Sequence, residues 1–359
     1  MSASAPPLLE TEQLEKWFPL TRSLTDTFRR AKTRSVHAVD VVSLSVGAGE
    51  TLGLIGESGS GKTTFGWLIA RLHEPTGGAI RFDGREITHL RGEALRAWRR
   101  NVQIVFQDPV GSLDPRLRVW QIVGEPIRAQ TGVAGAALRA RVRDLLPDVG
   151  LPPDCIDQYP HEFSGGGRQR LSMARALSVS PRLIVLDEPT SALDVAVQAQ
   201  ILNRLVTLQR ERGLSYVLIT HNVAAVRFVA DRVAVMYLGR LVEVGGVHEV
   251  LEHPVHPYTK ALLAAVPFPD PSRRRTRYRI GGDIPSLVDP KPGCRFAPRC
   301  PFVIPRCRVE DPPLAPVAGA GGVRLVACHR AEEVKEIAPE SLLATAPATP
   351  AAPPEPVTG

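Results

Sequence analysis

The sequence predicts an α/β fold in which a parallel sheet carries a phosphate-binding loop. A glycine-rich run stands between a short apolar strand pattern and a helical pattern, within residues 50–70. Two further apolar runs, residues 183–186 and 216–220, each lead into polar side chains, as central parallel strands do. Hydrophobic residues make up 43% and charged residues 23% of the chain, close to the averages of soluble globular proteins.

Length and charge narrow the class of protein. With 359 residues the chain has room for two domains of ~100–200 residues each. No apolar run reaches the ~18 residues that cross a bilayer. Residues 1–7 lack a basic start followed by an apolar core, so we expect a cytosolic chain without a secretory signal. The net charge of +7 would suit a protein that binds nucleic acid or anionic lipid. Most of the basic residues are arginine, however, which a genome with biased codons explains equally well, and we expect no nucleic-acid partner.

The glycine-rich run has the residue order of a loop that holds nucleotide phosphates. Glycines let backbone N–H groups close around phosphate oxygens, and the start of the following helix adds the positive end of a dipole. Lys62 would place its charge between the β- and γ-phosphates, and the Thr63 hydroxyl would hold Mg²⁺. An ordinary glycine-rich turn is the alternative. The residues of the run are Gly56, Glu57, Ser58, Gly59, Ser60, Gly61, Lys62, Thr63 and Thr64.

The chain before this loop predicts an edge strand at residues 8–20 that leads into two aromatic side chains, Trp17 and Phe18. Phe18 stands before a proline and would lie against the adenine of a nucleotide, with ordinary packing as the alternative. Residues 21–35 form a basic loop that we expect to be exposed, and residues 39–46 resume the strand pattern.

Beyond the loop, residues 77–84 have hairpin character and residues 102–106 form a strand of buried type. Gln107 follows that strand, where its amide suits a sensor of the γ-phosphate because it can reach a metal ion or a water. Residues 119–151 turn helical, and Pro147 should kink or end that helix.

A second glycine-rich helix start follows at Ser164, Gly165 and Gly166. Such a start is an anion site, yet one chain rarely needs two of them for the same phosphate. We therefore infer that these residues serve a nucleotide held by another subunit.

Polar residues suited to phosphate chemistry follow the two apolar runs. Asp187 could hold Mg²⁺ through water, while Glu188 could orient and deprotonate an attacking water. A capping role for either acid is the alternative. His221 ends the second run, and although a lone histidine is more often structural, it is the third polar group at a strand end.

Taken in order, these motifs resemble the ATP-binding subunit of an ABC transporter over residues 8–265. The resemblance implies a nucleotide-binding fold with a RecA-like core, an antiparallel β subdomain and a helical subdomain at about residues 115–180. It also implies ATP held head-to-tail between two such subunits. Lys62, Thr63, Gln107, Asp187, Glu188 and His221 of one subunit would then face Ser164, Gly165 and Gly166 of the other.

The last third resembles the C-terminal extension of oligopeptide and dipeptide importer ATPases, in residues 253–263, 282–287 and 292–301. The resemblance implies a subunit, peripheral on the cytoplasmic face of the membrane, that powers peptide import. Its partners would be a second ATPase, giving a heterodimer, two transmembrane permease subunits and an extracytoplasmic solute-binding protein. An importer of nickel or another small solute is one alternative. A soluble ABC ATPase and a non-hydrolysing regulatory half are the others.

Four cysteines cluster in this extension, which we place at residues 266–335. Four thiolates are the number that an iron–sulfur cluster needs, and the resemblance suggests a 4Fe-4S cluster on them. Zinc is the second choice, since the spacing lacks paired Cys-x-x-Cys knuckles. Four unligated cysteines are the third possibility. The residues are Cys294, Cys300, Cys307 and Cys328.

Three further features of the sequence are a C-terminal tail, an arginine-rich segment and Gly167. Residues 336–359 are rich in alanine and proline without apolar periodicity, which predicts a disordered tail. The arginine-rich residues 273–279 could face lipid headgroups or form a solvated linker. Gly167 stands where relatives of the resembled family usually have glutamine or glutamate.

Overall fold

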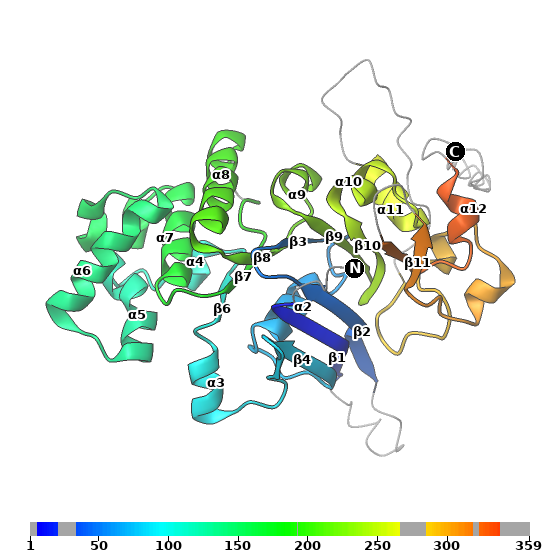
Figure 1. Cartoon of the computed structure of the whole chain (residues 1–359), viewed down its shortest axis with the longest axis horizontal. Helices are drawn as coiled ribbons and strands as arrows, with labels where there is room; N and C mark the ends of the chain where they lie inside the picture. Colours follow the sequence, from blue (N-terminus) through cyan, green and yellow to red (C-terminus); the bar gives the residue numbers. More distant parts are fainter. Residues whose placement is uncertain (1–5, 21–33, 192, 266–284, 319–322, 338–359) are drawn as a thin grey trace, which may run out of the picture.

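The computed structural model describes residues 6–20, 34–191, 193–265, 285–318 and 323–337. The predicted basic loop apart from Arg34 and Ser35, the arginine-rich linker and all but the first two residues of the predicted tail lie outside the described residues. A sheet of eight strands runs through the molecule, with a sheet of four strands on one side of it (Figure 1).

The eight-stranded sheet is parallel on one side and antiparallel on the other. Its order is β11-β12-β10-β9-β3-β8-β7-β6, and every neighbouring pair from β9 to β6 is parallel. The carboxyl ends of β3, β6, β7 and β8 therefore meet at one edge. The bounds are β3 (Thr51–Ile55), β6 (Val102–Val105), β7 (Leu183–Asp187), β8 (Ser215–Ile219), β9 (Arg232–Tyr237), β10 (Arg240–Gly246), β11 (Ala315–Ala318) and β12 (Val323–Val326).

Apolar residues cover both faces of the central strands, which explains why these strands read as continuous apolar runs. In β7, Leu183 and Val185 pack into the core beneath the four-stranded sheet. Ile184 and Leu186 point the other way, into the core shared with the helices. Alternation with period two along a strand thus joins two hydrophobic cores through one sheet.

The four-stranded sheet is antiparallel between neighbours and has the order β2-β1-β4-β5. Its strands are β1 (Leu9–Pro19), β2 (Ser35–Val46), β4 (Gly77–Phe82) and β5 (Arg85–Glu86). The prediction of an edge strand at residues 8–20 is wrong, because β1 pairs with β2 on one side and β4 on the other. The predicted hairpin at residues 77–84 is confirmed as β4 and β5.

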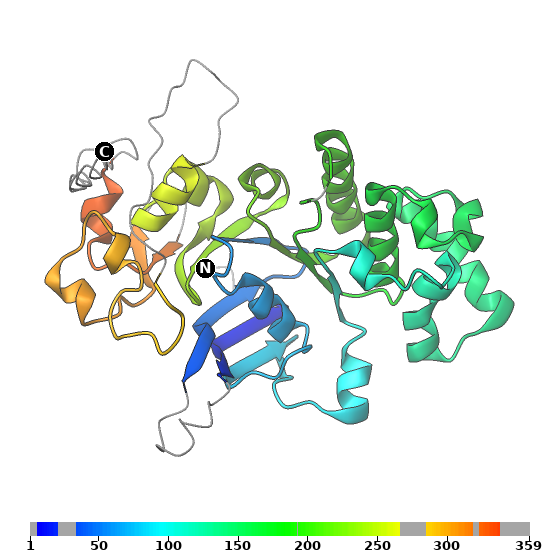
Figure 2. The same ribbon diagram turned by 180° about the vertical axis from the view of Figure 1, so that it is seen from behind.

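The helices of residues 119–177 form a group beyond β6, at the opposite end of the molecule from the last third of the chain (Figures 1 and 2). The predicted helix before Pro147 ends at Leu145, and a 3₁₀ turn, Leu146–Val149, follows. The helices are α2 (Lys62–Ile69), α3 (Gly92–Trp98), α4 (Pro109–Ser112), α5 (Val119–Thr131), α6 (Gly135–Leu145), α7 (Gly165–Leu177), α8 (Val195–Arg212), α9 (Val223–Val229), α10 (Val247–Glu252), α11 (Pro257–Ala264) and α12 (Ala331–Lys335). Shorter 3₁₀ turns are Pro153–Asp157, Pro160–Glu162, Ala297–Arg299 and Pro305–Arg308.

The last third of the chain continues the large sheet. Strand β12 pairs with β10 through Glu243 and Val244, and β11 pairs with β12. A second contact lies at the small sheet, where Val36 of β2 forms an isolated bridge with Val288. The extension therefore touches both sheets that surround the phosphate loop.

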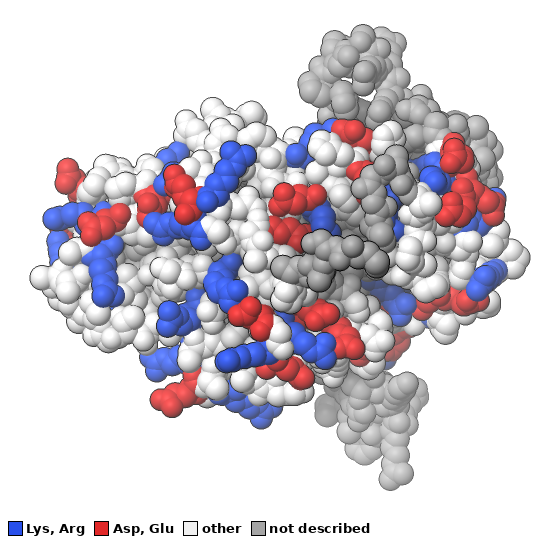
Figure 3. All heavy atoms as spheres, in the orientation of Figure 1, with Lys and Arg blue, Asp and Glu red and all other residues white. Residues whose placement is uncertain are grey.

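On the face seen in Figure 3, positive and negative side chains are interspersed over the helical group and the small sheet. The surplus of positive charge is thus not gathered into a single patch on the described residues of that face. Within the described ranges no helix combines the length and apolar content that crossing a bilayer needs.

Candidate functional site

The glycine-rich loop joins β3 to α2 and packs tightly against its neighbours. Gly56 and Gly61 have φ values of 156° and 101°. A Cβ on Gly56 would lie 2.1 Å from the Met236 carbonyl oxygen, and one on Gly61 would lie 2.1 Å from that of Ala38. Only glycine fits where two backbones approach so closely. Glycine-rich loops of this kind can turn backbone amides toward an anion.

Lys62 is the first residue of α2, and its side chain folds back over the loop. The Nζ atom donates to the carbonyl oxygens of Gly56 at 2.9 Å and Glu57 at 2.8 Å. Burial lowers the pKa of Lys62, while the nearby carboxylates of Glu188 and Asp187 act in the opposite direction. An incoming phosphate would meet an ammonium group already held at the mouth of the loop.

Two acids stand at the carboxyl end of β7, Asp187 as its last residue and Glu188 directly after it, and their surroundings differ. Asp187 Oδ1 accepts a hydrogen bond from Thr63 Oγ1 at 3.1 Å, and burial raises the pKa of Asp187. Glu188 Oε1 lies 2.8 Å from His221 Nδ1 and accepts from the His221 backbone N–H at 3.1 Å. Glu188 also has a φ of 48°, a strained conformation for a residue with a side chain. Such strain is typical of functional positions.

A cavity of about 660 Å³ brings most of the predicted residues together. The whole loop from Gly56 to Thr64 lines it, together with Gln107, Glu188 and His221. These residues follow strands β3, β6, β7 and β8, whose carboxyl ends share one edge of the sheet. Ligands of open parallel sheets bind at that edge. The cavity therefore has the position and the hydrogen-bond donors that a nucleoside triphosphate site needs.

Phe18 does not line this cavity. It lies on β1 opposite Val36, which does line it. Its ring meets His73 edge-on with centroids 5.8 Å apart, and Lys16 Nζ is 5.2 Å from its centroid. Phe18 is thus one strand away from the cavity wall.

Ser164, Gly165 and Gly166 also lie outside the cavity lining. Ser164 caps α7, its Oγ accepting from the Gly167 N–H at 3.3 Å. A Cβ on Gly166 would lie 2.5 Å from Cγ1 of Val197, so α7 and α8 approach closely there. Within one chain these residues do not meet the phosphate loop's cavity.

The sequence analysis missed three residues that contact the loop or its cavity. Tyr258, Leu287 and Arg299 contact the loop or its cavity from the last third of the chain. Tyr258 is 201 residues from its loop partner and Arg299 is 242, so no local pattern connects them.

The prediction of a 4Fe-4S cluster is wrong, and zinc finds no support either. Among the described residues, which include all four cysteines, no group of three or more His, Cys, Asp or Glu is arranged to hold a metal ion. Burial raises the pKa of Cys294 to about 11 and that of Cys300 to about 12. Both pack against the main hydrophobic core.

Comparisons with known proteins agree with the geometry. Residues 39–191 match the ABC transporter family, and residues 242–307 match the oligopeptide/dipeptide transporter C-terminal region. The probable peptide ABC transporter ATP-binding protein y4tS of Sinorhizobium fredii is 48% identical over 90% of this chain and 89% of its own length. The oligopeptide transport ATP-binding protein AppF of Bacillus subtilis is 44% identical over 91% of this chain and 98% of its own.

Solved structures show the same fold. The ATP-binding cassette MJ0796, in a dimeric post-hydrolysis state bound to ADP and Pi, superposes with a TM-score of 0.59. It is 27% identical and covers 67% of this chain and 98% of its own. The cbiO1 protein of Clostridium perfringens, part of the transporter complex cbiONQ, is 28% identical, with a TM-score of 0.58, over 68% of this chain and 91% of its own.

Proposed function

We propose that this chain, which belongs to the family of ABC transporter ATP-binding proteins, hydrolyses ATP to power the import of oligopeptides or dipeptides. The single observation that carries hydrolysis is the cavity in which the phosphate loop meets Gln107, Glu188 and His221. The match of residues 242–307 to the oligopeptide/dipeptide C-terminal region supports the class of cargo.

The phosphates of ATP would lie on the amides of the loop, with Lys62 supplying positive charge. Thr63 and Asp187, already joined at 3.1 Å, offer the oxygen donors that Mg²⁺ prefers, and Gln107 lies in the same cavity. These residues therefore fit a magnesium ion, which when bound neutralises charge on the phosphates.

Glu188 is the general base of this proposal. Its carboxylate is 12% exposed and holds the His221 ring and backbone by hydrogen bonds, so it is aimed into the cavity. A carboxylate in that position would take the proton of the attacking water as the water oxygen bonds to the γ-phosphorus and the bond from that phosphorus to the bridging oxygen breaks, which releases ADP and phosphate. His221 keeps Glu188 in place and faces the same space.

The proposed assembly rests on the second glycine-rich helix start, which does not line this chain's own cavity. Ser164, Gly165 and Gly166 point to a nucleotide on a second ATPase subunit, since they lie outside this chain's own cavity lining. In the proposed complex two different ATPases sit on the cytoplasmic face of the membrane beneath two permease subunits. Within this chain, the proposed subdivisions are the helical region of residues 115–180 and the extension beyond residue 265. Phe18 is the proposed contact with adenine, from the strand next to the cavity wall. A solute-binding protein delivers the cargo from outside.

Replacing Glu188 tests the catalytic assignment. In the complex purified with its permease, Glu188→Gln should bind ATP normally but lose turnover by roughly 10²- to 10⁴-fold at this chain's site, because an amide cannot accept the proton. The partner's own glutamate is changed to glutamine in both samples, so that one site is measured. Stimulation of the active complex by peptides, and not by nickel, tests the cargo.

Glu74→Gln is the matched control, since Glu74 pairs with Arg91 on the surface and is 63% exposed. It should leave turnover unchanged. Near-normal hydrolysis by the Glu188 variant at the isolated site would refute the catalytic assignment.

A further inference from the structure

An ion pair joins the extension to the phosphate loop. Arg299 Nη1 lies 3.1 Å from Glu57 Oε2, and Nη2 lies 3.4 Å from Oε1, so the guanidinium grips the carboxylate with both arms. The Arg299 side chain is 6% exposed and that of Glu57 is 26% exposed. A shielded, two-point pair holds its partners in one geometry, unlike a surface pair.

Glu57 is held at its backbone as well. Its N–H donates to the Tyr258 hydroxyl at 2.8 Å, and Tyr258 packs on Tyr237 with ring centroids 4.5 Å apart. The Tyr237 hydroxyl in turn accepts from Arg299 Nη1 at 3.2 Å. Arg299 and Tyr258 thus fix both ends of the loop's second residue.

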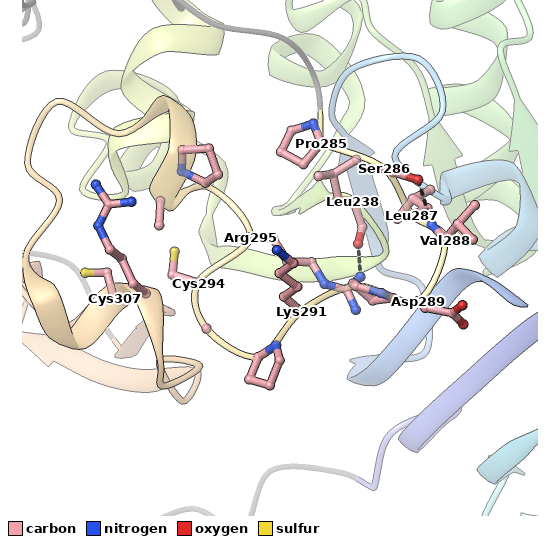
Figure 4. Close-up of a pocket in the computed structure, with 16 residues that line it drawn as sticks. Leu238, Pro285, Ser286, Leu287, Val288, Asp289, Lys291, Cys294, Arg295 and Cys307 are labelled. Carbon is pink, nitrogen blue, oxygen red and sulfur yellow. Dashed lines mark hydrogen bonds between the residues drawn. The ribbon is translucent and has the colours of Figure 1, made fainter. Parts of the chain in front are cut away.

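A neighbouring arginine reinforces the same junction. Figure 4 shows Arg295 reaching the Leu238 carbonyl oxygen, and its guanidinium also pairs with Asp40. Gly239, which follows Leu238 in the chain, donates its N–H to the Ser60 carbonyl oxygen at 2.8 Å. The extension therefore contacts the loop directly at Glu57, through Arg299, and through Arg295 it holds Leu238, the neighbour of the residue that contacts Ser60.

The segment before Arg295 reaches the cavity wall. The Leu287 carbonyl oxygen accepts from the His37 N–H of β2 at 3.0 Å, and the Asp289 N–H donates to Ser35 at 3.0 Å. Figure 4 shows residues 285–289 running beside β2. The Leu287 side chain then joins Val36 and Ala38 in lining the cavity.

We propose that Arg299 is a positioning residue for ATP, acting through Glu57. It fixes the loop's amides before the nucleotide arrives, and it neutralises a carboxylate that would otherwise lie unpaired beside the phosphates. This inference rests on the proposed function, because it concerns the same cavity.

The charges around Lys62 explain why neutralisation matters. Glu57, Asp187 and Glu188 all act on its ammonium group, and ATP brings further negative charge to that place. With Arg299 removed, Glu57 would repel the incoming phosphates and its side chain would lose its anchor. Both effects weaken binding of ATP more than they slow its hydrolysis once it is bound.

A double-mutant cycle on the full chain in its complex tests the pair. Arg299→Gln should raise Kd for a fluorescent ATP analogue and KM for ATP about fivefold, with kcat nearly unchanged. In a Glu57→Gln background the same change should alter Kd less than about twofold. Arg299→Lys, which keeps the charge but not the two-armed grip, should fall between, and it carries the test if the glutamine variant does not fold.

Arg306→Gln is the matched control, because Arg306 pairs with Glu310 within the same extension at 59% exposure and touches no loop residue. Its Kd should equal that of the wild type. Equal losses on Arg299→Gln in both backgrounds would overturn the proposal.

Hydrogen exchange without nucleotide separates this inference from the proposed function. If the wild type bound no ATP, the proposed function would fail, and exchange alone would judge the role of Arg299 in positioning the loop. Faster exchange at the amides of residues 57–62 in Arg299→Gln then supports that role, and unchanged exchange refutes it.

Discussion

Glu188 and Val41 are among the described residues with side chains that adopt the left-handed region. Glu188, with a φ of 48°, is held by His221 and Thr220 at the end of β7. Val41, with a φ of 55°, is 44% exposed and lies between Asp40 and Val42 of β2. A β-branched residue in this region is an outlier, and the strain costs of order 1–3 kcal/mol.

Val41→Asn should therefore raise the free energy of unfolding by about 1 kcal/mol, because asparagine tolerates the left-handed region. Urea unfolding of the two proteins measures the change. Val309→Asn is the control, since Val309 is 73% exposed and has an ordinary φ of −124°. If both variants shifted stability by the same amount, strain at Val41 would not be the cause.

The positions of the polar residues at strand ends were predictable, while their chemical roles stay predictions. Gln107, Glu188 and His221 follow apolar runs, and the carboxyl ends of parallel strands meet at one edge, so the sequence alone led to a shared cavity. Arg299 and Tyr258 could not be predicted as neighbours of the phosphate loop. They lie 242 and 201 residues from Glu57 in the sequence and meet it only in the folded chain. The cysteine prediction failed because number and spacing along the sequence do not determine how side chains meet in the fold, and the described residues contain no group arranged to hold a metal ion.

The element that joins the large sheet to the extension contains a buried histidine. His256 caps α11, where its Nδ1 accepts from the Tyr258 N–H at 3.0 Å. Its backbone N–H donates to Glu243 of β10 at 2.9 Å. Burial lowers the pKa of His256 to about 3, so the ring stays neutral in the folded chain.

Acid should weaken this element in a defined range. Above the unfolded pKa of about 6.5 the ring is neutral in both states. Between that value and about 3 only the unfolded chain binds the proton, so stability falls as the pH falls. The loss amounts to about 1.4 kcal/mol for each pH unit below 6.5.

His256→Asn checks this, because an amide oxygen can cap α11 without titrating. Unfolding free energies at about pH 7 and pH 5.5 should show the wild type losing about 1.4 kcal/mol more than the variant. Burial raises the pKa of the neighbouring Glu243, and both proteins share that group, so it cancels in the difference. Equal losses would mean that His256 carries no part of the acid sensitivity.

At the scale of the assembly, Gly167 belongs to the surface that we place against a partner's nucleotide. It lies in the first turn of α7, where glycine costs up to about 1 kcal/mol relative to alanine. A Cβ there would lie 3.0 Å from Phe163 Cβ, so that side chain must yield by a few tenths of an ångström.

Gly167→Gln should tighten ATP-driven closure and raise hydrolysis mainly at the partner's site, because the new side chain can help to position the nucleotide there. Each site is measured alone, with the other silenced by a glutamate-to-glutamine change. Gly167→Ala separates helix stabilisation from the added amide. An equal gain at both sites, or a gain only at the Lys62 site, would contradict the head-to-tail arrangement.

The pairing of β10 with β12 limits how such subunits can be recombined. Glu243 of β10 is fully buried and lies 3.5 Å from Arg324 of β12, which is 4% exposed. A chimera spliced after residue 265 would keep the Glu243 carboxylate but replace the Arg324 guanidinium that pairs with it. The edge of β10 would then be covered only if a strand of the foreign extension paired with it. A working graft would have to take β10 along with the extension, so the natural splice boundary lies before residue 240, inside the sheet that also carries the phosphate loop.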